Sequence, residues 1–179
     1  MNRFFLLLPL LVACAEDVGT LTDEALAPPG NSPAFVVSQV VAGTPIRMTW
    51  GDVPPGATVT FAASAAGLGA GPCPPVLGGA CLNIARPVIL GTATASANGV
   101  ATLLRQAPAN LPAGGYAFQA VAVAPGIGLL SDTYERATGL AFCSRIYDPV
   151  CGYDDVTYAN ECGAHSAGVP VSYFGPCVP

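Results

Sequence analysis

The sequence lacks the residues and motifs on which most enzymes and nucleic-acid-binding proteins depend. Its 179 residues include no lysine, six arginines and one histidine, His165, and the net charge is −5. An acidic chain without a basic patch is not expected to bind nucleic acid. No GxSxG, HExxH, phosphate-loop or paired acidic motif is present, so we predict neither an enzyme nor a cofactor site.

Long apolar runs are absent as well. Residues 1–13, MNRFFLLLPLLVA, contain an apolar run of ten residues, whereas a membrane-spanning helix needs about 20. The single arginine before this run completes the pattern of a secretory signal peptide. We therefore predict a signal peptide here and not an anchor helix.

The apolar run ends at Cys14, in the sequence Leu11-Val12-Ala13-Cys14, which resembles the bacterial lipobox. In that motif the cysteine sulfur receives diacylglycerol, and several acyl chains on one residue give stable anchoring. Ala15, rather than Asp, follows the cysteine, which in the resemblance favours the outer membrane. We expect a lipid-anchored protein of the bacterial cell envelope; the alternative is an ordinary signal peptide followed by a chance cysteine.

The number of cysteines is odd, and lipidation of Cys14 accounts for this. Six of the seven cysteines then remain, an even set that predicts three disulfides and an oxidising, extracytoplasmic compartment. Cys73 and Cys81 form one near pair. Four cysteines lie in the C-terminal segment, and by themselves they allow three pairings. They are Cys143, Cys151, Cys162 and Cys177.

The middle of the chain divides by composition. Residues 14–33 are rich in proline, glycine and acidic residues, which predicts a flexible tether. Residues 34–141 carry short runs of Val, Ala, Thr and Leu between turn residues, with alternation such as Ile46, Met48 and Trp50 facing one way. Seven such runs favour an antiparallel β-sandwich with Trp50 in its core. The expected strands are 35–41, 46–50, 58–63, 88–95, 100–104, 116–122 and 129–136, and a Cys73–Cys81 bridge would close the connection 66–85.

The C-terminal segment has the most specific pattern in the chain. Four landmarks of a known family are in register: seven residues between Cys143 and Cys151, a Pro-Val-Cys-Gly turn at 149–152, a Thr-Tyr-Ala-Asn run at 157–160, and ten residues between Cys151 and Cys162. A closing Gly-Pro-Cys ends at Cys177. By these landmarks, residues 142–179 resemble the Kazal family of serine-protease inhibitors.

One departure from the family concerns the disulfides. A six-cysteine Kazal domain has two further cysteines that bond to each other, one before the first cysteine of this pattern and one at the place held here by His165. Their absence removes one whole bridge. The resemblance implies that the remaining pairs are Cys143–Cys162 and Cys151–Cys177. Packing of Phe142 against the preceding domain is one candidate replacement for the lost bridge.

The resemblance also implies a reactive site. In the family, the second residue after the first cysteine of this pattern enters the primary specificity pocket of the protease, and here that residue is Arg145. The bond presented would be Arg145–Ile146, with Ser144 and Ile146 beside the arginine, Tyr147 packed beneath the loop and Asn160 hydrogen-bonding the loop from inside. A planar cationic side chain suits a pocket floored by an aspartate, so the implied partner is a trypsin-like serine protease.

The residues of this segment also predict its local structure. So small a segment needs covalent staples to fold. Asn160 is a good helix N-cap and Gly168 a good stop, so we expect a helix over about 161–167 and an extended return over 169–173. Asp154-Asp155 is expected in the tight turn of a hairpin. The expected small core consists of Val150, Tyr158, Val169, Val171 and Tyr173.

Three functional hypotheses follow. The first is a surface lipoprotein that displays an inhibitor of trypsin-like proteases on a β-sandwich stalk. The second is a non-inhibitory surface or adhesion protein, in which the Kazal-like module is a structural cap and Arg145 a solvated charge. In the third, the β-sandwich binds a partner and the module regulates nothing. Cys162-x-x-His165 has zinc-like spacing, but cysteines of an exported chain pair with each other, so no metal site is predicted.

Overall fold

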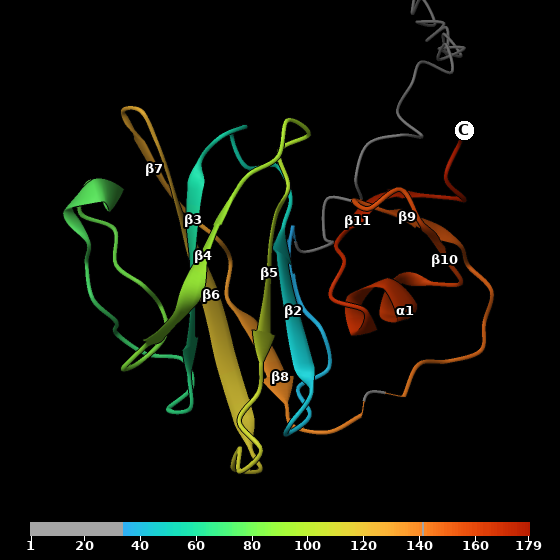
Figure 1. The fold of residues 1–179 in the computed structure, drawn as a ribbon, viewed down its shortest axis with the longest axis horizontal. Helices are drawn as coiled ribbons and strands as arrows, with labels where there is room; N and C mark the ends of the chain where they lie inside the picture. Colours follow the sequence, from blue (N-terminus) through green and yellow to red (C-terminus); the bar gives the residue numbers. More distant parts are fainter. Residues whose placement is uncertain (1–33, 141) are drawn as a thin grey trace, which may run out of the picture.

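The computed structural model describes residues 34–140 and 142–179 (Figure 1). The predicted signal peptide 1–13, Cys14 and the tether 14–33 lie outside the described residues. The described part consists mainly of antiparallel β-strands with one α-helix and one 3-10 helix, which confirms the mainly β prediction. No helix in that part is long and apolar enough to cross a membrane.

Residues 34–140 form two antiparallel sheets (Figure 1). The first sheet has the strand order β1-β2-β5. The second has the order β4-β3-β6-β7, and β8 pairs with the other half of the long strand β6. The strands are β1 (Phe35–Val37), β2 (Pro45–Trp50), β3 (Thr58–Ser64), β4 (Val88–Thr94), β5 (Ala101–Gln106), β6 (Gly115–Ala124), β7 (Ile127–Leu130) and β8 (Tyr134–Ala137).

The two sheets share one hydrophobic core. Phe35 and Met48 of the first sheet are buried in the same cluster as Phe61 and Phe118 of the second, and the Phe35 and Phe61 ring centroids are 6.1 Å apart. Trp50 is in this cluster and 7% exposed, which confirms its predicted place. Two sheets around one core are compatible with the predicted sandwich, which stays a prediction.

The predicted strand 129–136 is wrong in one respect, because it is two strands that pair with different halves of β6. Val121 of β6 pairs with Leu130, and Phe118 of β6 pairs with Tyr134. The step from 118 to 121 in β6 is thus matched by the longer step from 130 to 134 in the partner segment of the chain. The partner therefore contains one extra residue, as in a β-bulge. The Ser131 hydroxyl accepts a hydrogen bond from the Ala120 N–H at 2.8 Å, so a side chain replaces a backbone acceptor at the interruption.

The connection 66–85 covers the second sheet on the face opposite to the shared core. Cys73 and Cys81 are bonded within it, and the 3-10 helix η2 (Pro75–Leu77) lies between them. Side chains of the connection and of the sheet form a second, smaller core: Leu77, Leu82, Ile84, Ala62 and Ala117. The stapled connection is thus a packed layer and not a free loop.

Residues 142–179 form a small module. Its strands β9 (Val150–Gly152), β10 (Thr157–Tyr158) and β11 (Val171–Phe174) have the order β10-β9-β11, and its helix is α1 (Glu161–Ser166). The helix is one residue shorter than predicted. Asp155 has a φ of 59°, the left-handed conformation of the predicted hairpin turn. The core of the module contains the predicted Val150, Val171 and Tyr158, and also Ala164 of α1.

The module lies against the first sheet, on the side away from the shared core (Figure 1). Two glycines permit the close approach. A Cβ atom at Gly168, where φ is +74°, would lie 2.8 Å from the Arg47 carbonyl oxygen, and one at Gly51 would lie 2.9 Å from the Tyr153 ring. Both distances are shorter than a nonbonded contact to carbon allows, so larger side chains would separate the module from the sheet.

Phe142 does not take part in this contact. Its side chain is 93% exposed, so the idea that packing of Phe142 replaces the lost bridge is wrong. Figure 1 shows the reason: after β8 the chain runs around the outside of the module, and α1 is the element that faces the sheet.

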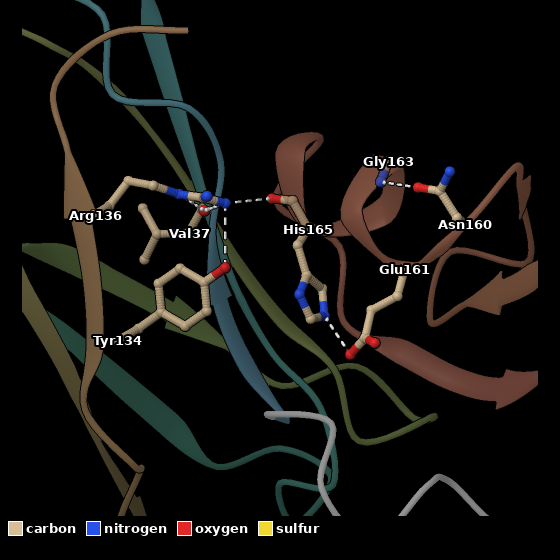
Figure 2. A network of polar contacts seen from close by, with 7 residues as sticks. All are labelled: Val37, Tyr134, Arg136, Asn160, Glu161, Gly163 and His165. Atoms are coloured by element: carbon tan, nitrogen blue, oxygen red, sulfur yellow. Dashed lines mark hydrogen bonds and ion pairs between the residues drawn. The ribbon is translucent and has the colours of Figure 1, made fainter. Parts of the chain in front are cut away.

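His165 of α1 lies at the contact with the sheet (Figure 2). Its carbonyl oxygen accepts a hydrogen bond from Arg136 Nη2 at 3.1 Å, and its ring packs edge-on against Tyr134. The His165 Nε2 atom is 3.8 Å from Glu161 Oε1, too far for a hydrogen bond, and within the described structure it has no hydrogen-bond partner. Burial lowers the pKa of His165, with Glu161 acting in the opposite direction.

The shared core can be tested with one substitution at two neighbouring positions. Val59 is fully buried in the core, whereas Val123, on the adjacent strand, is 39% exposed. Val59→Ala should lower the free energy of unfolding by about 2 kcal/mol or more, because it removes two methyl groups and leaves a cavity. Val123→Ala should cost less than about 1 kcal/mol. Urea unfolding of both variants checks this, and equal losses would contradict the assigned core face.

His165 predicts a pH dependence of stability. Its pKa is lower in the folded protein than the value of about 6.5 expected in the unfolded chain. Protonation therefore favours unfolding, so the contribution is fully present above about pH 6.5 and is lost as the pH falls below it. The free energy of unfolding can be measured in urea at about pH 7.5 and about pH 5.5 for the wild type and for His165→Gln. Its decrease between the two pH values should be larger for the wild type. Equal losses would show that His165 does not titrate in this way.

Candidate functional site

Residues 143–148 cross the surface of the module without regular secondary structure. Ser144, Arg145, Ile146 and Tyr147, the predicted reactive-site residues, are all exposed, and Ile146 is 71% exposed although it is apolar. In the part of the chain that the structure describes, Arg145 forms no ion pair with a carboxylate. The Arg145 side chain is therefore available to a partner.

Asn160 joins this exposed segment to α1. Its Nδ2 atom donates hydrogen bonds to the carbonyl oxygens of Ser144 at 3.1 Å and Ile146 at 2.9 Å. Its Oδ1 atom accepts from the Gly163 N–H at 2.9 Å and so caps the helix. The two accepting carbonyls flank Arg145. One amide thus fixes the backbone on both sides of the exposed arginine.

One disulfide holds the start of the segment and another holds β9, which follows it. Cys143 is bonded to Cys162 of α1 with a Cα–Cα distance of 5.6 Å, and Cys151 is bonded to Cys177 with a Cα–Cα distance of 4.8 Å. These are the pairs that the family resemblance implies. Since Cys162 is in a disulfide, it is not available to hold a metal with His165, and the described residues contain no group of three or more potential metal ligands.

An open surface pocket of about 300 Å³ lies beside the segment. Its lining comes from the segment, α1 and strands β9 and β11: Ser144, Ile146, Asp148, Val150, Asn160, Glu161, Cys162 and Phe174. Tyr147 is not part of this lining and is 72% exposed, so the prediction that Tyr147 packs beneath the loop is wrong. The pocket is lined from the segment by Ser144, Ile146 and Asp148, and the intervening Tyr147 points elsewhere.

The hairpin beside the segment is held by a phenol–carboxylate hydrogen bond. Tyr158 Oη donates to Asp154 Oδ2 at 2.8 Å. Burial, this hydrogen bond and the charge of Asp154 together raise the pKa of Tyr158 to about 12. The hydroxyl therefore stays protonated and continues to donate in mildly alkaline solution as well as at neutral pH. Burial and a hydrogen bond to Asp52 likewise raise the pKa of Tyr153, which links the module to the chain just after β2.

Two residues near the site were not singled out from the sequence. Arg136 and Tyr134 of β8 contact α1 from the other part of the chain. They are two positions apart, so they lie on the same face of a strand. This spacing was visible in the sequence, but nothing in it showed which surface of the module the strand would face.

Comparison with known proteins identifies the family. The family profile described as "Kazal-type serine protease inhibitor domain" matches residues 131–177. "Serine protease inhibitor Kazal-type 1" of Canis lupus familiaris is 42% identical over an alignment of 41 residues, with a coverage of 20% of this chain and 72% of that protein. The protein of the same name in Homo sapiens is 35% identical over an alignment of 60 residues, with a coverage of 30% of this chain and 72% of that protein. The comparison with solved structures found no match.

Other relatives are covered less completely. "Serine protease inhibitor Kazal-type 1" of Mus musculus is 74% identical over 23 residues, which are 13% of this chain and 29% of that protein. The chain therefore spans under a third of the length of this relative, and residues 34–130 lie outside the family profile. Through its C-terminal module, the chain belongs to the Kazal-type serine protease inhibitor family, whose members are inhibitors rather than enzymes.

Proposed function

We propose that the protein inhibits trypsin-like serine proteases by presenting the Arg145–Ile146 bond in a fixed, substrate-like conformation. The observation that carries this proposal is the position of Asn160, whose amide holds the carbonyl oxygens on both sides of Arg145 while the arginine side chain is exposed. A segment already held in its bound conformation loses little entropy when it docks. That favours tight binding.

The disulfides support a slow reaction of the bound segment. If the protease attacks the Arg145 carbonyl, the amino group of Ile146 is released but remains attached to the module. Cys143 lies before the bond and is tied to α1, whereas Cys151 lies after it and is tied to Cys177. The new amino group therefore stays near the acyl carbon and can re-form the peptide bond. The segment would then act as a tight ligand and a slow substrate.

Arg145 sets the class of protease. A guanidinium is planar, carries five N–H donors and pairs with a carboxylate through two hydrogen bonds. A specificity pocket floored by an aspartate, as in trypsin-like enzymes, offers this partner. Arg145 has no competing carboxylate among the described residues, so no internal ion pair has to be broken on binding.

The rest of the chain is proposed to display the module. The three disulfides indicate an oxidising, extracytoplasmic environment. In our proposal, lipid on Cys14 anchors the protein at the outer membrane, residues 14–33 form a tether and residues 34–141 form a β-sandwich stalk. The module at 142–179 would then face proteases outside the cell membrane.

The specificity proposal can be tested with the purified protein and trypsin. Arg145→Ala should weaken inhibition at least about thirtyfold, equivalent to about 2 kcal/mol, because it removes the central anchor. Arg145→Leu should shift inhibition toward chymotrypsin-like enzymes, whose pocket is apolar. The matched control is Arg105→Ala, which removes an exposed arginine of β5.

Inhibition constants measured for each variant against both enzymes decide the outcome. Equal inhibition by the wild type and Arg145→Ala would remove this arginine from the mechanism. A wild-type protein that inhibits neither enzyme would support the hypothesis of a non-inhibitory structural cap.

The anchoring proposal can be tested by changing Cys14 to Ser in the full chain. The variant should be released from the membrane fraction or stay unprocessed, because lipid on this one sulfur is proposed to be the anchor. Membrane fractionation and the mass of the amino-terminal peptide measure this. A variant with unchanged fractionation and an unchanged peptide mass would contradict lipidation at Cys14.

A further inference from the structure

Both supports of the reactive segment lie at the amino-terminal end of α1. Asn160 caps this helix and donates to the segment, and Cys162 in its first turn is bonded to Cys143. The helix has six residues and is therefore only about 9 Å long. Any movement of α1 relative to the rest of the protein would carry Asn160 and Cys162 with it.

The other end of α1 is held by the sheets of residues 34–140. Arg136 of β8 donates from Nη2 to the His165 carbonyl oxygen at 3.1 Å and to the Val37 carbonyl oxygen of β1 at 3.0 Å (Figure 2). The Gln39 N–H donates to the Ser166 carbonyl oxygen at 3.3 Å. One guanidinium thus connects β8, β1 and the last turn of α1.

Arg136 is itself held in place by the shared core. Its Nη2 atom lies 3.1 Å from Tyr134 Oη, and the guanidinium carbon lies 5.3 Å from the Tyr134 ring centroid. The Tyr134 ring packs edge-on against Phe35 in the core. A planar fork can serve several acceptors at once, whereas the single ammonium of lysine on its flexible stem cannot match this geometry.

Gly168 and Tyr153 make further close contacts with the first sheet, but one part of the contact is more open. A cleft of about 730 Å³ lies between the first sheet and the module, with Arg47 and Asp154 in its lining. These two side chains are 4.0 Å apart and are 39% and 32% exposed. Exposed ion pairs contribute little to stability. This pair therefore holds the module weakly compared with the hydrogen bonds of Arg136.

We propose that Arg136 is a positioning residue for the reactive segment. It holds α1 against β1 and β8, and α1 in turn holds Asn160 and Cys162 behind Arg145. The β-sheet part of the chain is then part of the inhibitory framework and not only a stalk. Two measurements test this inference, and the second of them, inhibition of trypsin, rests on the proposed function.

The first readout is structural and does not depend on inhibition. The Asp148 N–H donates to the Ala159 carbonyl oxygen at 2.9 Å and so reports the attachment of the segment to the module. In the full chain, Arg136→Ala should speed hydrogen exchange of the Asp148 amide by about tenfold or more, the factor for one lost hydrogen bond to a charged group. Arg136→Lys should have an intermediate effect. Arg105→Ala should have none.

Val59→Ala is the control for general destabilisation. It weakens the shared core without touching α1, so it should speed exchange in β3 without a selective effect on Asp148. A selective effect of Arg136→Ala on Asp148 supports the inference. An Asp148 exchange rate in Arg136→Ala equal to that of the wild type, or raised only in proportion to β3, would overturn it.

The second readout is inhibition of trypsin at a temperature at which all variants are folded. Arg136→Ala should raise the inhibition constant by about tenfold, while Arg105→Ala and Val59→Ala leave it unchanged. Asn160→Asp keeps a capping oxygen but loses both bonds donated to the segment, so it sets the scale for a segment without its support. Equal inhibition constants for the wild type and Arg136→Ala would overturn the inference. If the wild type does not inhibit, the proposed function fails and the exchange of Asp148 alone decides the role of Arg136.

Discussion

The candidate site depends on the hydrogen bonds of the Asn160 side-chain amide. The segment that carries Arg145 belongs to no sheet or helix, and an unsupported backbone gives up roughly 1–2 kcal/mol of conformational entropy per residue when it is ordered. Asn160 supplies hydrogen bonds on both sides of the arginine and, with its other atom, caps α1. The conformation of an exposed loop is thereby coupled to a helix whose inner side is buried in the module.

The size of the module explains why that helix needs support from elsewhere. Its core is small, built from Val150, Ala164 and Val171 with Tyr158 packed against them, and two disulfides close it. At His165, where the family resemblance implies a further cysteine in six-cysteine domains, Arg136 donates a hydrogen bond to the backbone carbonyl and the ring lies against Tyr134. Polar contacts to a neighbouring sheet thus lie at the place of a covalent bond. Burial lowers the pKa of His165, so we expect the ring contact, unlike a disulfide, to weaken when the imidazole is protonated.

Much of the fold followed from short-range patterns. Alternation of apolar residues located the strands around Met48 and Phe61, and an N-cap asparagine with a later glycine located α1, because a few neighbouring residues decide these conformations. The split between β7 and β8 could not be predicted from such patterns. It depends on Ser131 bonding to Ala120 across the sheet, and no local pattern shows whether a serine hydroxyl will replace a ladder bond.

The sequence by itself determined the membership of the family, the exposed position of Arg145 two residues after Cys143, and a mainly β fold for residues 34–140. These depend on spacing along the chain, which a sequence displays directly. Only the tertiary structure decided that Tyr147 and Phe142 face solvent, that the connection 66–85 covers a sheet, and that Arg136 reaches α1. Each of these outcomes depends on which surfaces meet in space. Complementarity between surfaces far apart in the chain leaves no periodic trace in the order of the residues.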